Sequence, residues 1–224
     1  LEGQDRIKQL FISDIRGSQP VALTSGSNSA VDFAPSPDGS RVVYIAQTGD
    51  LKNEIWLADV NSGENKKLAD CSEAMCSQPV WSPDGSRVLY EHISLEATNA
   101  TGLATLWWVD VNTGKAQSLF QEEQLPGANP RWSPDGKWLS YATSENIQLY
   151  NLENGESRAI TSALGASAAW APDGKSVLYR DVIIQSNQFI TQLFIYDLQT
   201  KTPTNICPDL GFENILAAWS PDGE

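Results

Sequence analysis

The feature that most constrains this chain is a ten-residue pattern that recurs along its whole length. The stretch WSPDGSRVLY at 81–90 is one copy, and WSPDGKWLSY and WAPDGKSVLY begin at 132 and 170. Aligned on the Pro-Asp-Gly turn, five copies are anchored at Asp38, Asp84, Asp135, Asp173 and Asp222, with steps of 46, 51, 38 and 49 residues. A period of this length indicates stacked copies of one supersecondary unit, because a single unit cannot bury its apolar face alone.

A second fixed block accompanies each turn. It is an apolar or aromatic run that ends in Asp or Asn, such as IWLAD at 55–59 and LWWVD at 106–110. Nine positions after that Asp or Asn stands an aliphatic residue in all five copies: Leu23, Leu68, Leu119, Ile160 and Ile206. Together the two blocks predict four antiparallel strands per copy, A to D, with the Pro-Asp-Gly turn between strands A and B. Radial packing of such sheets would bury the Trp and Tyr columns, so the sequence predicts an all-β β-propeller of four-stranded antiparallel blades.

The pattern Trp-Ser-Pro-Asp-Gly-x-x-(Val/Leu)-x-Tyr, with its aromatic-rich strand ending in Asp, resembles the propeller repeats of the TolB family. Related repeats occur in the propeller domains of tricorn protease and of prolyl oligopeptidase-type peptidases. The resemblance covers nearly the whole chain, with Pro35, Ala171 and Asn151 as departures from the Trp, Ser and Asp columns. It implies a six-bladed ring, of which about five blades are visible here. We therefore expect 1–224 to be a single propeller domain from a longer chain, with five-bladed closure as the alternative.

Charge and cysteine content narrow the class of partner. The 28 acidic and 15 basic residues give a net charge of −13, which would repel a phosphate backbone and argues against nucleic acid. No apolar run approaches the roughly 18 residues of a transmembrane segment. Cys71 and Cys76 are close enough in sequence to form a disulfide, although the third cysteine, Cys207, is left over. No histidine cluster or second cysteine pair favours a metal, and we expect no cofactor.

The variable connections indicate where binding residues lie. The B–C loops, expected at Ile45–Glu54, Glu91–Thr105, Ala142–Asn146 and Arg180–Gln192, differ most in length and share one rim with the D–A connections. Twelve acids and two bases fall on this rim. This negative charge would steer a basic partner toward the rim; the alternative is that it only keeps the protein soluble. The candidate partner-binding residues are Asp50, Glu54, Glu91, Glu96, Glu122, Glu123, Asp181, Asp209 and Glu213. Leu95, Leu103, Leu125, Phe189 and Phe212 add apolar contact surface, unless they pack beneath the loops.

Catalytic signals are weak. His92 is the only histidine, and the chain contains no Gly-x-Ser-x-Gly nucleophile elbow. We therefore predict a non-enzymatic scaffold for protein–protein interaction; the TolB resemblance implies a periplasmic location and partners in an envelope complex. One alternative is the substrate-gating propeller of a serine peptidase whose catalytic domain lies outside this sequence. The other is a propeller that binds a carbohydrate or another small ligand, which aromatic residues in register on the loops would favour.

Overall fold

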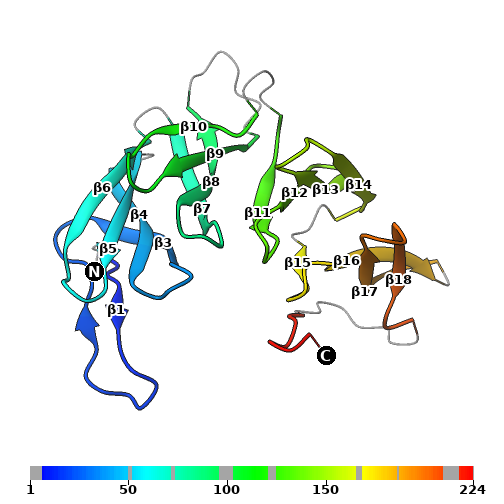
Figure 1. The fold of residues 1–224 in the computed structure, drawn as a ribbon, viewed down its shortest axis with the longest axis horizontal. Coiled ribbons are helices and arrows are strands. Elements are labelled where there is room, and N and C mark those ends of the chain that lie inside the picture. The colour runs from blue at the N-terminus through cyan, green and yellow to red at the C-terminus, as the bar shows by residue number, and fades with distance from the viewer. Residues whose placement is uncertain are drawn as a thin grey trace. The chain divides into compact units, whose positions relative to one another are not determined.

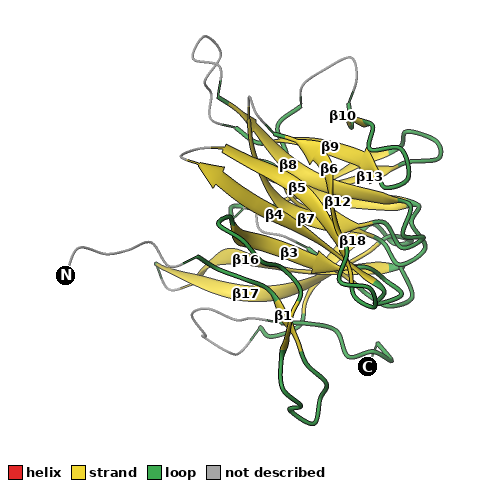
Figure 2. Ribbon diagram, turned by 90° about the vertical axis from the view of Figure 1, so that its left-hand side faces the viewer, coloured by secondary structure: helices red, strands yellow, loops and turns green. Residues whose placement is uncertain are grey.

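The computed structural model describes residues 7–49, 52–71, 74–95, 103–120, 125–164, 168–185, 187–208 and 217–223. Within them every regular element is a β-strand, and none is a helix long and apolar enough to cross a membrane (Figure 2). The chain divides into two compact units, Leu1–Pro126 and Gly127–Glu224. Four four-stranded antiparallel sheets account for most of the strands (Figure 1). The predicted all-β class with four-stranded antiparallel blades is confirmed.

The first unit contains a two-stranded sheet and two four-stranded sheets whose strands follow one another in chain order. The small sheet consists of β1 (Phe11–Ile12) and β2 (Val21–Ala22). The next sheet consists of β3 (Ser29–Pro35), β4 (Arg41–Gly49), β5 (Lys52–Asp59) and β6 (Asn65–Asp70). The last consists of β7 (Ala74–Trp81), β8 (Arg87–Ser94), β9 (Thr105–Asp110) and β10 (Ala116–Ser118).

The second unit repeats this arrangement with two further four-stranded sheets. One consists of β11 (Ala128–Trp132), β12 (Trp138–Ala142), β13 (Asn146–Asn151) and β14 (Ser157–Thr161). The other consists of β15 (Ala169–Trp170), β16 (Ser176–Gln185), β17 (Gln188–Asp197) and β18 (Thr202–Asn205). In every four-stranded sheet the strands follow the predicted order from A to D.

The tryptophan column joins neighbouring sheets inside each unit. Trp81 is 6% exposed, packs in one cluster with Val43 and Ile55 of the preceding sheet, and donates its indole N–H to the carbonyl of Ala34 at 3.0 Å. In the second unit the buried Trp170 donates in the same way to the hydroxyl of Ser140, also at 3.0 Å. Each indole therefore fills the space between two sheets and satisfies its own polar atom there.

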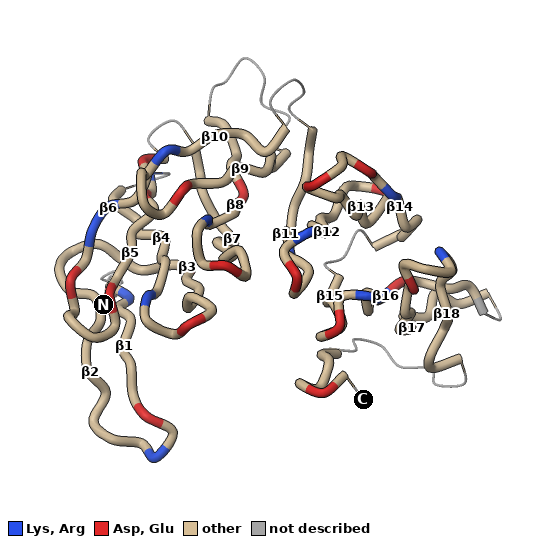
Figure 3. The backbone as a smooth tube through the Cα atoms, viewed as in Figure 1, with Lys and Arg blue, Asp and Glu red and all other residues tan. Residues whose placement is uncertain are grey.

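The Ser-Pro-Asp-Gly turn is held by its own serine and aspartate. Ser133, which is fully buried, donates its hydroxyl to the Asp135 carboxylate at 2.6 Å and accepts the backbone N–H of Trp138 at 2.9 Å. The same serine-to-aspartate bond holds Asp38 in the first copy and lowers the pKa of that carboxyl to about 2. The acidic segments at the turns after β3, β7, β11 and β15 in Figure 3 belong to this repeated turn. These aspartates are structural, as predicted.

The copy with Ala171 offers a direct test of this hydroxyl. Its turn keeps the backbone bond from Gly174 to Ala171 and the bond from the Lys175 N–H to the Asp173 carboxylate, so only the bonds of a serine hydroxyl are missing. We expect Ala171→Ser to raise the free energy of unfolding by about 0.5–1.5 kcal/mol, the net value of an intramolecular hydrogen bond. Ser133→Ala should lower it by about 1–3 kcal/mol, because the carboxylate and a backbone N–H lose their partner. Urea unfolding of both variants checks this; equal, small effects would contradict the role given to the serine.

The turn between strands C and D depends on the column that ends each strand C. Asp59 accepts the backbone N–H groups of Asn61 and Ser62 at 3.0 and 2.8 Å. Asn151 accepts two N–H groups in the same way, which explains why an amide can replace the acid there. In the four-stranded sheets the backbone has a positive φ four positions after this residue, as at Gly63 with 72°.

Lys201 occupies this left-handed position in the last sheet, with φ of 59°. A residue with a Cβ is disfavoured there by roughly 1–2 kcal/mol. We expect Lys201→Gly to raise the free energy of unfolding by about 1 kcal/mol, since glycine adopts this φ without steric conflict. The reciprocal change Gly63→Lys should lower it by a similar amount, because a Cβ at Gly63 would meet no atom within 4 Å and only the backbone preference changes. Chemical denaturation measures both changes in unfolding free energy. Changes of the same sign for Lys201→Gly and Gly63→Lys would contradict this explanation.

The expected B–C loops are wrong at three of the four positions. Strands β4 and β5 pair as far as Gly49 and Lys52, and β16 and β17 pair as far as Gln185 and Gln188. Strand β8 likewise continues to Ser94, inside the loop expected from Glu91. Only Ala142–Asn146 is the short connection expected, between β12 and β13. The physical reason is visible in residues 182–184, where three β-branched side chains favour strand.

Candidate binding rim

The structure describes three of the nine candidate partner-binding residues. Glu54 lies in β5, Glu91 in β8 and Asp181 in β16, so each belongs to a strand where a loop was expected. The other six lie outside the described residues: Asp50, Glu96, Glu122, Glu123, Asp209 and Glu213. Phe212 lies outside them too. The site is therefore built from the strand ends and from what surrounds them.

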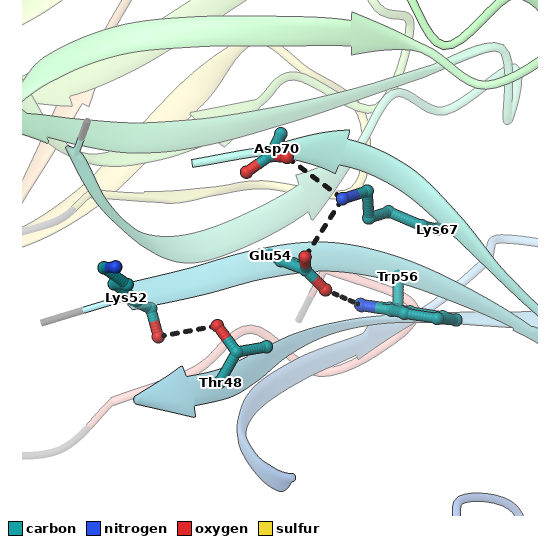
Figure 4. A network of polar contacts seen from close by, with 6 residues as sticks. All are labelled: Thr48, Lys52, Glu54, Trp56, Lys67 and Asp70. Atoms are coloured by element: carbon teal, nitrogen blue, oxygen red, sulfur yellow. Dashed lines mark hydrogen bonds and ion pairs between the residues drawn. The ribbon is translucent and has the colours of Figure 1, made fainter. Parts of the chain in front are cut away.

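Glu54 belongs to a polar network on the first four-stranded sheet (Figure 4). One of its carboxylate oxygens lies 3.0 Å from the Lys67 ammonium, and the other accepts the indole N–H of Trp56 at 2.8 Å. Lys67 also contacts Asp70 at 3.0 Å, and the bonds to Asp70 and then Glu54 raise the pKa of the lysine. Lys67 thus offsets one of the two negative charges. Lys67 lies in β6, a strand D. The charge count from the sequence covered only the expected loops, so it did not include this lysine.

The other two described acids hold segments of their own chain. Glu91 is 9% exposed and accepts the hydroxyl of Ser77 in the neighbouring strand at 3.1 Å. Asp181 accepts the backbone N–H of Ala163, in the connection before β15, at 2.9 Å. These carboxylates therefore fix the positions of rim segments. Both carboxylates add negative charge to the electrostatic potential of the rim, although neither is fully open to solvent.

A double hydrogen bond ties the two four-stranded sheets of the first unit together at this rim. The Asn53 amide donates to the carbonyl of Cys76 at 2.9 Å and accepts its N–H at 3.0 Å. Cys76 also forms a disulfide with Cys71, with Cα atoms 6.2 Å apart, and both cysteines are buried. Cys76 is thus held both by the disulfide to Cys71 and by the two hydrogen bonds to Asn53. Sequence reasoning missed Asn53, because a single asparagine in an apolar strand carries no pattern.

His92 packs as an aromatic side chain. Its ring stacks on Trp107 with centroids 4.5 Å apart and planes inclined by 20°. Burial lowers the pKa of its imidazole, so the neutral ring is favoured. Among the residues that the structure describes, no three His, Cys, Asp or Glu side chains are grouped so that they could hold a metal ion.

Exposed apolar side chains lie at the same ends of the strands. Ile184 and Phe189, a cross-strand pair near the tip of the β16–β17 hairpin, are 71% and 78% exposed. At the corresponding end of the β7–β10 sheet the exposed apolar side chains are Met75, Leu95, Leu103 and Leu125. Leu95, Leu103, Leu125 and Phe189 thus expose 39%, 54%, 39% and 78% of their surface to solvent, which is the apolar contact surface expected of them.

Comparison with protein families identifies the repeat. The model of the TolB beta propeller domain matches residues 2–179, which is most of the chain and spans parts of both units. The chain belongs to this TolB propeller family. The resemblance read from the Trp-Ser-Pro-Asp-Gly pattern is confirmed.

Individual relatives are of two kinds. The Bacillus subtilis (strain 168) protein named "Uncharacterized peptidase YuxL" is 26% identical over 165 residues, which are 60% of this chain and 25% of that protein. The Tol-Pal system protein TolB of Hahella chejuensis is 25% identical over 120 residues, which are 50% of this chain and 28% of that protein. The chain thus spans about a quarter of the curated relatives that it matches.

Two solved structures share the architecture. Oligogalacturonate lyase from Vibrio parahaemolyticus has a TM-score of 0.72 at 14% identity, covering 96% of this chain and 67% of the lyase. The tricorn protease has a TM-score of 0.70 at 15% identity, covering 96% of this chain and 25% of the protease. At these identities the likeness shows the fold alone.

The amide contact of Asn53 can be tested with an isosteric change. Asn53→Asp replaces the donor to the Cys76 carbonyl by an acceptor, and we expect a loss of at least about 2 kcal/mol in unfolding free energy at neutral pH. The carbonyl disfavours the carboxylate, so its folded pKa should exceed the unfolded value of about 3.9. The penalty should then shrink as the pH falls through that folded pKa, because a protonated acid donates again.

Urea unfolding between pH 7 and pH 4 measures both effects. Asn61→Asp, the same charge change at an exposed turn position, serves as the control. A pH-independent penalty at position 53 equal to that at position 61 would show that the amide contact does not stabilise the fold.

Proposed function

We propose that the chain is a non-enzymatic TolB-like propeller domain that binds a protein or peptide through the rim formed by its B–C and D–A connections. The observation that carries this proposal is the projecting hairpin of β16 and β17. The flanking strand β15 pairs only with Val177 and Leu178, and β18 pairs only from Phe194 to Asp197. The last four pairs of the hairpin, from Val182 to Gln185, continue without a third strand among the described residues.

Exposed apolar pairs on such a ribbon are suited to contact with another protein. Phe189 and Ile184 are the most exposed large apolar side chains in the described part of the second unit. Aromatic side chains in this setting supply much of the binding energy in protein interfaces. No third strand among the described residues pairs with this part of the ribbon, so its backbone edges are suited to strand addition; the Val182 N–H is already bonded to the Asp181 carboxylate. A surface of this kind accounts for a binding role without any catalytic group.

The domain organisation and location follow the same proposal. We place residues 1–224 in one propeller domain of a longer protein, since the repeat anchored from Asp38 to Asp222 runs through both units without interruption. We also place it outside the cytoplasm, in the periplasm, with partners in an envelope complex. Two observations support this: the relation to a Tol-Pal system protein, and a disulfide that persists best in an oxidising compartment.

A second function is favoured by one relative. The match to a protein named as a peptidase supports a role as the substrate-gating propeller of a serine peptidase. In that case catalytic residues would belong to a domain outside this sequence. The rim would then select substrates rather than hold a permanent partner.

Affinity capture from native envelope extract separates the two functions. The bait is the full-length protein, compared with Ile184→Ser/Phe189→Ser and with the reversal of Glu122, Glu123, Asp209 and Glu213 to Lys. We expect a captured partner whose recovery falls by about tenfold or more with the hairpin variant, the loss of a typical aromatic hot spot. Ile15→Ser/Val21→Ser removes two exposed apolar side chains of the β1–β2 hairpin, away from the B–C and D–A connections, and should leave recovery unchanged.

Recovery that is equal from parent and hairpin variant would contradict a binding role for this hairpin. Equal recovery from the charge-reversed variant would leave the acidic rim as a solubility feature. If the full-length protein captures nothing and hydrolyses peptides, the gating function replaces the scaffold.

A further inference from the structure

The edge of β17 that faces β18 is free along the part of the strand that lies in the projecting hairpin. The ladder between β17 and β18 ends where the N–H of Ile206 donates to the carbonyl of Leu193 at 3.0 Å. Backbone groups alternate between the two edges of an antiparallel strand, and β16 and β17 pair without a register shift. Thr191 and Phe189, two and four residues before Leu193, therefore direct their N–H and C=O groups to this same edge. No described strand pairs with β17 there.

The chain after β18 is turned away from this edge by its own contacts. The N–H of Cys207 donates to the Asn205 side chain at 3.0 Å, and Pro208, which would lie opposite Thr191 in a continued ladder, has no N–H. The Pro208 carbonyl instead accepts the side-chain amide of Gln192 at 3.2 Å. Gln192 is fully buried, and its amide oxygen accepts a second bond from Asn205. The β18 ladder therefore stops before Thr191.

The opposite edge of the hairpin, on β16, is partly occupied. The carbonyl of Ser176 accepts the N–H of Ala171 from the β15 side, so the N–H of Val182, six residues further along β16, faces that side too. This N–H donates to the Asp181 carboxylate at 2.8 Å. The same carboxylate oxygen accepts the N–H of Ala163 at 2.9 Å. Addition of a strand is thus favoured on β17 rather than on β16.

The free edge of β17 also lacks the features that protect other outer strands. Natural edge strands carry charged residues or proline, or are short, which discourages pairing with another chain. In this protein β6 contains Lys67, β14 contains Arg158, β18 contains Pro203, and β10 has 3 residues. No charged residue, proline or glycine lies between Asp181 and Asp197. The β17 edge is therefore open to pairing in a way that these four strands are not.

Charge and side-chain chemistry indicate which strand fits this edge. Phe189 and its cross-strand partner Ile184 are largely exposed, and the side chains around them are uncharged. A charged side chain placed against them would lose hydration without gaining an ion pair. The net charge of −13 opposes pairing with a second copy of this chain. An uncharged segment of another protein, rich in β-branched or aromatic residues, meets both conditions.

We propose that the free edge of β17, from Phe189 to Leu193, adds an extended, uncharged strand of the partner protein. The inference rests on the proposed binding function and specifies the conformation and chemistry of the bound partner segment. In the complex, Phe189 and Thr191 exchange backbone hydrogen bonds with the added strand. The exposed ring of Phe189 packs against an apolar side chain of that strand.

Fluorescence anisotropy with a defined peptide tests this edge. The probe is fluorescein-labelled (Thr-Val)4, and the protein is the full-length chain. The comparison peptide has the same side chains but is N-methylated at every residue, so it donates no backbone hydrogen bond. We expect the unmethylated peptide to bind with little dependence on salt, because neither surface is charged. The dissociation constant of the methylated peptide should be about tenfold higher or more.

A pair of proline variants identifies the edge that binds. Thr191→Pro removes an N–H that faces the free edge and none that bonds to β16, so the dissociation constant of the unmethylated peptide should rise about tenfold. Val182→Pro makes the same change at the cross-strand partner of Thr191, whose N–H faces the other edge. This matched control should bind the peptide like the parent.

Equal dissociation constants for Thr191→Pro and Val182→Pro would overturn the site. Equal binding of the methylated peptide, or no binding of either peptide by the parent, would do the same. Circular dichroism checks folding; if a proline variant unfolds, Thr191→Lys and Val182→Lys replace the pair, since a charge also protects an edge strand. A concentration-dependent dimer lost only in the variant at position 191 would assign the edge to a second copy and overturn the partner strand.

Capture from native extract separates this inference from the proposed function. If Thr191→Pro captures the partner as well as the parent does, while Ile184→Ser/Phe189→Ser loses it, strand addition fails and the proposed function stands. A parent that captures nothing removes the proposed function itself.

Discussion

Everything in this fold depends on apolar contact between sheets, because one four-stranded sheet by itself can shield neither of its faces from water. The indole column meets this requirement within each unit. Trp81 and Trp170 reach from the first strand of one sheet to the preceding sheet, where each finds a hydrogen-bond acceptor as well as apolar neighbours. Each indole contact therefore buries apolar surface and also fixes the position of one sheet against the preceding one. The turns and strand ends of both sheets are positioned as a result.

The repeat made the fold predictable, because its invariant columns are the ones that the architecture needs. Ser133 with Asp135 closes the turn between strands A and B, and Asp59 closes the turn between strands C and D. Both roles are local, so they can be read from spacing. Strand length beyond the columns could not be read this way, since the residues after Tyr179 extend the hairpin through β propensity and pairing rather than through a fixed motif.

The candidate site was predictable in outline and unpredictable in its contacts. Counting acids along expected loops directs attention to the rim, but a count does not show which residues those acids contact. Lys67 compensates Glu54 from a strand that lies 13 residues further along the chain, and Asn53 clamps Cys76 from 23 residues away. Neither contact can be predicted from the spacing of residues in the sequence, because each depends on how the strands and sheets are placed in three dimensions. What remains visible to sequence alone is the apolar character of Leu103 and Phe189, whose exposure the structure supplies.

The sheet of β15–β18 differs from the other three four-stranded sheets in two ways that act in the same direction. Its A–B turn contains Ala171 in place of the serine, and its C–D turn places Lys201 in a left-handed backbone conformation. Both features make the closed turns less favourable, so amide hydrogen exchange should be fastest here among the four sheets. The β16–β17 hairpin, which extends beyond its flanking strands, is thus attached to the sheet expected to open most readily. A partner that adds a strand to this hairpin would slow that exchange, so the surface that binds would also be the surface that gains stability on binding.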